Sequence, residues 1–251
     1  MSRNGELYLQ REVVRANWGV RDFVVFDIGA NRGDWSASLL QNMSSAPSDW
    51  TGARCFAFEP ISATRVRLTI RLQADEGRRI EIVPGAVSDR PGRMRMAVMS
   101  PTGGTNSLVF DKEMESAALG FEDVELVTID QFCKDRQINH IHLIKCDTEG
   151  NDLNVLRGAL ALLKNGSIDV FQFEYNYRWI NAAAFLKDVF SLVEGTPYVI
   201  ARVMTDYIEV FDRWHPELDR FFQSNYALVH SAKVKLFRAR QGTFDKSNTY
   251  A

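Results

Sequence analysis

The sequence predicts an α/β fold in which helices cover both faces of a mostly parallel β-sheet. Short, almost wholly apolar segments alternate along the chain with segments of helical spacing, which is the pattern of such folds. Nearly continuous apolar runs are typical of strands that are buried on both faces. Polar residues follow the ends of these runs, where ligands bind in open parallel sheets. The length of 251 residues fits a single domain over 1–251.

The first part of the chain supplies three of the predicted strands. An N-terminal helical segment occupies 1–20, because Leu7, Val14 and Trp18 lie near one face of a helix over 6–18. Strands are predicted at 23–28, 53–58 and 80–84, with helices between them at 34–43 and 62–73. Residues 44–52 are rich in Ser, Pro, Asp and Gly, so we expect a loop there.

An insertion at 85–128 interrupts this alternation. A Pro-Gly turn at 91–92 precedes an alternating segment at 93–98, and residues 124–128 alternate again. This pattern predicts a small antiparallel insertion between the third and fourth core strands. The loop at 101–106 contains paired glycines, and we expect the insertion to lie over the ligand face as a lid.

The second part of the chain returns to alternating strands and helices. Strands are predicted at 141–146, 168–173, 197–203 and 226–230. A helix at 150–163 carries leucines at core spacing, with Gly166 as its stop signal, and a further helix is expected at 182–193.

Composition narrows the classes of function. Hydrophobic residues make up 45% of the chain, which is ample for a packed core. The net charge is −2, whereas nucleic-acid binders are more often basic, so nucleic acid is not the expected partner. The three cysteines form no C-x-x-C pair, which fits a reducing cytoplasm. Residues 1–6 are polar and lack the apolar core of a signal peptide. No apolar stretch approaches the roughly 18 residues of a membrane span.

The turn after the first strand is the most informative motif. Asp27, Gly29 and Gly33 follow an apolar run and precede a helix, in the order D-x-G-x-x-x-G rather than the dinucleotide spacing G-x-G-x-x-G. Backbone N–H groups at such a turn, here at Ala30 and Asn31, can meet a polar ligand. Asp27 can accept hydrogen bonds from an ammonium group such as that of S-adenosylmethionine.

The ends of the next two strands suit the rest of an adenosyl ligand. Glu59, followed by Pro60, can accept hydrogen bonds from both hydroxyls of a ribose. An adenine edge would lie at 85–89, beside Ala86, Val87 and Ser88. A structural interpretation exists for each motif, but the acid, the glycine turn and Glu59 occur together in the order that a cofactor site requires.

A second polar cluster closes the fourth strand. Lys145, Asp147 and Glu149 lie within 145–150, and Glu174 ends the fifth strand. Asp147 is the first candidate for a general base and Glu174 the second, while Lys145 can hold Asp147 ionised or stabilise an alkoxide. Asp147, Glu149 and Glu174 could alternatively bind Mg²⁺, although a metal-free site is preferred. Ion pairing and helix capping are the structural alternatives for this cluster.

Together these motifs resemble the FkbM family of methyltransferases. The resemblance rests on residues 27–31, 58–60, 85–89, 127–130 and 145–150, which occur in the family's order, and on residues 155–159 and 171–174. Cys146 and Thr148 stand where the family more often has aliphatic residues. The resemblance implies a class I, Rossmann-like methyltransferase fold, a three-layer sandwich around a mostly parallel seven-stranded sheet. It also implies S-adenosylmethionine as cofactor and O-methylation, often of a sugar or natural-product hydroxyl.

The leading hypothesis is therefore an S-adenosylmethionine-dependent O-methyltransferase. Its expected partner is a small-molecule or glycan acceptor, with a homodimer left open. Methylation of a nucleic-acid base or amine is one alternative, but the Asn/Asp-Pro-Pro-aromatic loop frequent in such enzymes is replaced here by 147–150. A nucleotide-binding regulatory protein without catalysis is the other, and the retained acidic cluster counts against it.

Overall fold

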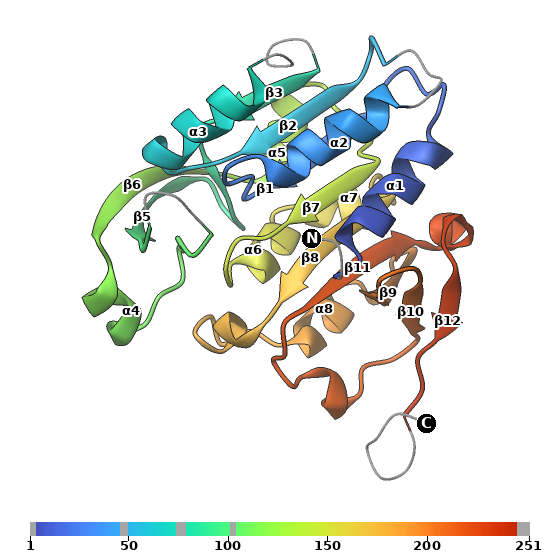
Figure 1. The fold of residues 1–251 in the computed structure, drawn as a ribbon. Helices are drawn as coiled ribbons and strands as arrows, with labels where there is room; N and C mark the ends of the chain where they lie inside the picture. The colour runs from blue at the N-terminus through green and yellow to red at the C-terminus, as the bar shows by residue number, and fades with distance from the viewer. Residues whose placement is uncertain (1–3, 46–49, 74–78, 101–103, 245–251) are drawn as a thin grey trace.

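The computed structural model describes residues 4–45, 50–73, 79–100 and 104–244. Over these residues a large sheet is covered by helices on both faces, and a smaller sheet stands at one side (Figure 1). The large sheet has nine strands: β1 (Val24–Ile28), β2 (Arg54–Phe58), β3 (Ile80–Val83), β7 (Leu143–Cys146), β8 (Val170–Tyr175), β9 (Tyr198–Val203), β10 (Ile208–Phe211), β11 (Ser224–His230) and β12 (Ala239–Gln241).

The strand order is β12-β10-β9-β11-β8-β7-β1-β2-β3. β3, β2, β1, β7 and β8 are parallel neighbours, and β11 runs antiparallel to both β8 and β9. The α/β class and the largely parallel sheet are confirmed. The expected count of seven strands falls short of the nine described, because β10 and β12 extend the sheet beyond β9.

The helices form two layers. One face carries α1 (Glu6–Ala16), α2 (Asp34–Ser44) and α3 (Ser62–Leu72), and the other carries α5 (Ile129–Asp135), α6 (Asp152–Arg157), α7 (Leu160–Lys164) and α8 (Leu186–Leu192). Single 3-10 turns lie at η1 (Tyr177–Ile180), η2 (Pro216–Leu218) and η3 (Ser231–Leu236). Within the described ranges, none of the helices combines the length and apolarity that a bilayer crossing requires.

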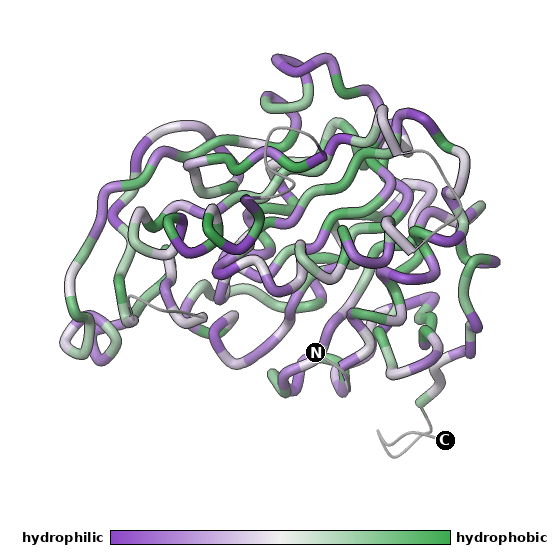
Figure 2. The backbone as a smooth tube through the Cα atoms, turned by 45° about the horizontal axis from the view of Figure 1, so that its top comes forward, coloured by the Kyte–Doolittle hydropathy of each residue, from purple (hydrophilic) through white to green (hydrophobic). Residues whose placement is uncertain are grey.

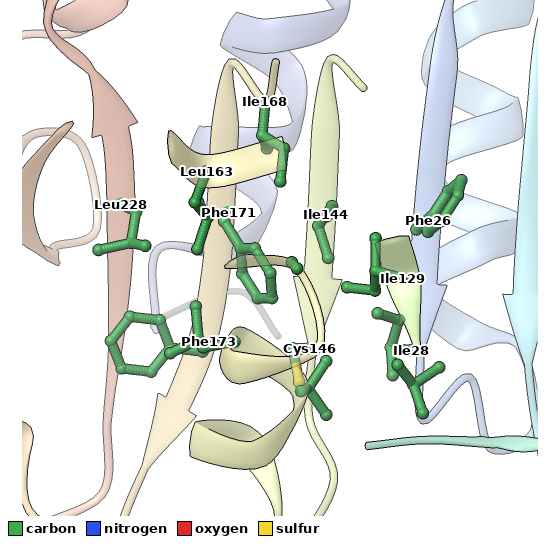
Figure 3. Close-up of a cluster of buried hydrophobic side chains, with 14 of the residues drawn as sticks. Phe26, Ile28, Ile129, Ile144, Cys146, Leu163, Ile168, Phe171, Phe173 and Leu228 are labelled. Atoms are coloured by element: carbon green, nitrogen blue, oxygen red, sulfur yellow. The ribbon is translucent and has the colours of Figure 1, made fainter. Parts of the chain in front are cut away.

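Side chains of successive strand residues alternate between the two layers. Phe26, Ile144 and Phe171 point toward the α5–α8 layer, where they pack with Ile129 and Leu163 (Figure 3). The alternate positions face α1 and α2, and hydrophobic residues concentrate along these central strands (Figure 2). Both faces of the sheet are therefore buried, as the continuous apolar runs predicted.

The insertion forms the smaller sheet. β4 (Ala86–Val87), β5 (Gly92–Val98) and β6 (Gly120–Val127) are arranged in the order β4-β6-β5, with the short helix α4 (Lys112–Ala117) before β6. β5 and β6 are antiparallel as predicted, whereas β4 pairs parallel with β6. Residues 101–103 of the expected loop lie outside the described residues.

Two predicted helices are shorter than expected. The helix at 150–163 is divided into α6 and α7 at Gly158, where an added Cβ would lie 2.1 Å from the Ser88 carbonyl oxygen. The helix at 182–193 begins only at Leu186, because Ala183 has a φ of 48° and cannot belong to a right-handed helix. The close contact at Gly158 joins the start of the insertion to the segment between α6 and α7.

Candidate functional site

The parallel strands β1, β2 and β7 end at one edge of the sheet, beside a cleft with a cavity volume of about 200 Å³. Its walls come from the segments that follow these strands, from α1 to α3, and from the insertion. Many of the residues predicted from the sequence line it: Gly29, Ala30, Asn31, Glu59, Pro60, Ala86, Val87, Lys145, Asp147 and Glu149. Asp27, Gly33, Ser88 and Glu174 lie outside these walls.

The glycine turn is shaped mainly by contacts within the protein. Gly29 has a φ of 75°, and an added Cβ would lie 2.0 Å from the Asp147 carbonyl oxygen. The N–H groups of Gly29 and Ala30 both donate to the Phe58 carbonyl, at 3.1 and 2.9 Å. The Ala30 N–H, which the sequence suggested for a ligand, thus ties β1 to β2 together with that of Gly29. Gly33 packs against Leu68 of α3.

Asp27 lies behind the cleft rather than in it. β1 extends to Ile28, so Asp27 is inside the strand and its side chain, which is 2% exposed, points toward α2. Ser36 Oγ donates to Asp27 Oδ2 at 2.6 Å, and Lys145 Nζ lies 3.5 Å from Asp27 Oδ1. Asp27 therefore supports Lys145 in this arrangement, and its contact with a ligand ammonium stays a prediction.

Lys145 stands between the buried acid and the cleft. Its Nζ donates to the Gly29 carbonyl at 3.3 Å and lies 3.6 Å from Asp147 Oδ2. Burial disfavours the ammonium, but the carboxylates of Asp147, Asp27 and Glu6 together raise the pKa of Lys145 above its ordinary value. Lys145 is therefore a permanent cation at neutral pH.

Glu59 follows the last residue of β2 and lines the cleft. Its Oε2 accepts from the Asn31 N–H at 3.0 Å, and its Oε1 accepts from the Ile61 N–H at 2.9 Å. Burial raises the pKa of Glu59 to about 7, although these two hydrogen bonds favour the carboxylate. Each oxygen can accept a further hydrogen bond, so Glu59 suits a pair of ligand hydroxyls.

The insertion contributes the part of the wall expected for an adenine. Ala86 and Val87 line the cleft, and Asn151 Nδ2 holds the Val87 carbonyl at 2.9 Å. Ser88 points away from the cleft, because its hydroxyl donates to Asp89 at 3.3 Å and its backbone packs on Gly158.

Asp147 and Glu149 follow β7 at the same edge. The Asp147 side chain is 34% exposed and faces Lys145 in the cleft. Glu149 Oε2 pairs with Arg178 Nε at 2.8 Å, and the Glu149 carbonyl accepts from Ser107 Oγ at 2.8 Å. Burial raises the pKa of Glu149 to about 8, with Asp147 adding to the rise and Arg178 opposing it.

Glu174 lies on β8, near this acidic group but outside the cleft walls. Its oxygens accept from Asn176 Nδ2 at 2.6 Å and from Gln223 Nε2 at 2.7 Å. Burial raises the pKa of Glu174 to about 7, and the charge of Asp147 adds to this effect. Two of the three carboxylates named for Mg²⁺, Glu149 and Glu174, are thus engaged by protein donors.

A different group of potential metal ligands lies at the opposite edge of the sheet. Among the described residues, the ligand atoms of His140, His142 and Asp169 lie within 4.8 Å of one another. His142 Nδ1 accepts the Val24 N–H at 3.1 Å, so the neutral ring carries its proton on Nε2. That tautomer offers no lone pair to a metal.

Sequence patterns did not identify three residues of the cleft. Glu6 enters from α1, Trp35 from α2 and Thr64 from α3. Within the described part of the chain, Trp35 Nε1 and Thr64 Oγ1 are buried without a hydrogen-bond partner, as is Asn31 Oδ1. Unpaired polar atoms in a buried wall are costly, and a bound polar ligand would satisfy them. Trp35 shares the buried face of α2 with Leu39 and Met43, so its spacing marks it only as a core residue. Glu6 is a single acid at the start of α1 and belongs to no motif.

Comparisons with known proteins agree with the fold. A sequence model described as "Methyltransferase FkbM domain" matches residues 27–219. A solved FkbM methyltransferase from Methylobacillus flagellatus KT is 18% identical with a TM-score of 0.50; the match covers 82% of this chain but only 43% of that one. An O-methyltransferase from Bacillus cereus in complex with SAH is 13% identical, with a TM-score of 0.47 and coverage of 89% and 80%. No curated protein sequence matches the chain.

Proposed function

This chain belongs to the FkbM family of methyltransferases, and we propose that it transfers a methyl group from S-adenosylmethionine to a hydroxyl of a sugar, glycan or natural product. The observation that carries this proposal is the cleft at the ends of β1, β2 and β7. It combines buried, unpaired polar atoms with an accessible carboxylate, Asp147, beside a fixed cation, Lys145.

The cleft offers groups that suit each part of the cofactor. Glu59 would accept hydrogen bonds from the ribose hydroxyls, and Ala86 and Val87 would contact the adenine. When bound, S-adenosylmethionine supplies a methyl group that its sulfonium activates toward an oxygen nucleophile. The protein then has to align the acceptor and exclude water, and alignment of this kind can contribute several kcal/mol.

Asp147 is the proposed general base. A hydroxyl acceptor loses its proton near the transition state, and a positioned carboxylate that takes it typically gives roughly 10²–10⁴-fold in rate. Asp147 faces the cleft, and the Lys145 ammonium 3.6 Å away stabilises its negative charge. Glu149 is paired with Arg178, so it is less suited to this role.

Glu174 remains the second candidate for the base. Its pKa of about 7 is close to the optimum for proton transfer at neutral pH. Two amide donors hold it outside the cleft walls, however, so an acceptor would have to replace one of them. A Mg²⁺-dependent variant of the reaction would need Glu149 and Glu174 to leave their present partners, and adding a chelator tests that variant directly.

Two measurements test the proposal. Calorimetry with S-adenosylhomocysteine measures whether the cleft binds the cofactor, and labelled S-adenosylmethionine with glycans, polyketides and RNA measures which acceptor is methylated. We expect saturable binding and label in a hydroxyl-bearing glycan or polyketide. Label in RNA alone would contradict O-methylation of a small acceptor, and binding without transfer to any acceptor class would favour a regulatory protein.

A further inference from the structure

A row of polar residues crosses the sheet on the face that α1 and α2 cover. Asp27, Lys145 and Gln172 occupy paired positions on β1, β7 and β8, so their side chains point to the same face. α1 covers this face next to α2 (Figure 1). Glu6 Oε1 accepts from Gln172 Nε2 at 3.1 Å, which places the Glu6 carboxylate beside the row.

Glu6 is held firmly in this place. Gly5, which precedes α1, has a φ of 81° and lies so close to β9 that a Cβ would be 2.3 Å from the Met204 carbonyl oxygen. One helical turn after Glu6, Gln10 Nε2 donates to the Trp35 carbonyl at 3.1 Å. Because residues four apart share a helix face, Glu6 lies on the side of α1 that faces α2, and Glu6 and Trp35 both line the cleft.

Trp35 presents an unused donor in the cleft wall. The residue is 4% exposed and lines the cleft, and no described residue forms a hydrogen bond with its Nε1–H. It lies in the first turn of the eleven-residue helix α2, which begins without a side-chain cap and whose N-terminal end favours negative charge. This donor therefore suits an anionic group of the ligand, whereas Glu6 suits a cationic one.

The charges at this end of the cleft favour a further cation. Glu6 and Asp147 line the wall, Asp27 lies behind it, and Lys145 is the cation among them. Arg32 and Asp34 also line the cleft but pair with each other at 3.5 Å, so the three carboxylates exceed the one remaining cation. Asp27, the acid expected to meet the cofactor ammonium, does not line the cleft, where Glu6 and Asp147 are the nearer acids.

We propose that Glu6 accepts a hydrogen bond from the ammonium of the cofactor's amino-acid tail, and that Trp35 Nε1–H donates to its carboxylate. The inference rests on the proposed use of S-adenosylmethionine. It assigns part of the cofactor site to α1, which lies outside the residues 27–219 that match the family.

The test compares two ligands that differ in the amino-acid tail. S-adenosylhomocysteine contains it and 5′-methylthioadenosine lacks it, and calorimetry measures both with the full chain. We expect Glu6→Gln and Trp35→Phe each to weaken S-adenosylhomocysteine roughly tenfold to hundredfold, the range of a hydrogen bond to a charged group. Both variants should bind 5′-methylthioadenosine as the wild type does. Glu12→Gln, on the same helix, is the matched control and should leave both affinities unchanged.

Each other outcome overturns the inference in a distinguishable way. Unchanged affinity of Glu6→Gln for S-adenosylhomocysteine would remove Glu6 from the site while leaving the proposed function intact. An equal loss for both ligands would show that Glu6 acts only by holding α1 in place. If the wild type bound neither ligand, the proposed function would fall and this inference with it.

Discussion

Single residues at the cleft combine structural and chemical constraints, and Gly29 shows how they can be separated. An added Cβ would lie 2.0 Å from the Asp147 carbonyl oxygen, and the residue has a φ of 75°. We therefore expect Gly29→Ala to destabilise the protein before any ligand is involved. The matched control is Gly195→Ala, because Gly195 has a φ of 73° but no atom within 4 Å of its Cβ position.

Both substitutions carry the cost of a left-handed residue, roughly 1–2 kcal/mol. Gly29→Ala should lose roughly 1–3 kcal/mol more, as overpacked sites do. Urea unfolding of the two variants measures the difference. Equal losses would show that the backbone near Asp147 can shift to make room for the added Cβ without a free-energy cost. The close approach of Gly29 to Asp147 would then not constrain the ends of β1 and β7.

Asp147 carries the prediction about chemistry at this scale. Asp147→Asn keeps the size of the side chain but removes the proton acceptor, so kcat should fall by roughly 10²–10⁴-fold. The affinity for S-adenosylhomocysteine should change little, since the proposed cofactor contacts are made by other residues. Steady-state kinetics and calorimetry measure the two quantities.

The exposed acid Glu194 offers a control for Asp147→Asn. Glu194→Gln should leave kcat and cofactor affinity at their wild-type values. If Asp147→Asn retained near-normal turnover, the base would have to be sought elsewhere, with Glu174 first.

At the scale of elements, α1 is the piece whose removal would affect both the core and the cleft. Leu9 is fully buried in the layer between α1, α2 and the sheet. Leu9→Ala should reduce the free energy of unfolding by about 2–5 kcal/mol, the range for large-to-small substitutions in a packed core. Thermal or urea unfolding measures the loss.

Arg11→Ala is the control on the same helix, because the Arg11 side chain is 63% exposed. Its effect should stay within about 0.5 kcal/mol. A loss for Leu9→Ala as small as that of the control would mean that α1 is only loosely docked, and the fixed position of Glu6 would no longer follow.

Local patterns predicted the central elements well and their interruptions poorly. The apolar runs at 23–28 and 53–58 correspond to β1 and β2 within a residue, because burial on both faces leaves a strong compositional signal. The break at Gly158 depends on the carbonyl of Ser88, seventy residues earlier, and so has no local signal. β10 and β12 are short strands at one side of the sheet, with β12 at the edge, and the pairing of β12 with β10 joins segments about thirty residues apart.

The candidate site shows the same division. Polar residues after strand ends, such as Glu59 and Asp147, were identified correctly as cleft residues because the edge of a parallel sheet gathers them. Asp27 does not line the cleft, because period-two alternation turns its side chain toward α2. Glu6 and Trp35 reach the cleft only through the packing of α1 on α2, which no motif encodes.

For the whole molecule, the two edges of the sheet respond to pH in opposite directions. At the carboxyl edge, burial raises the pKa of Glu59 to about 7 from an ordinary 4.5. The folded state then binds a proton that the unfolded chain has lost, so stability falls as pH rises between these values. At the other edge, burial and the charge of His140 lower the pKa of His142 to about 4 from 6.5, and stability falls as pH drops through this window.

The pKa values of Glu149, Glu174 and Asp152 are raised as well. Because the effect of these acids and Glu59 opposes that of the single residue His142, the free energy of unfolding should decrease from pH 5 to pH 7. Each group changes the slope by at most about 1.4 kcal/mol per pH unit. Glu59→Gln should therefore reduce the loss by up to about 3 kcal/mol over this range. His142→Asn keeps an acceptor for the Val24 N–H but cannot titrate, so it should steepen the loss by up to about 2 kcal/mol. Urea unfolding at several pH values measures both slopes, and changes of the same sign in the two variants would contradict the opposite character of the two edges.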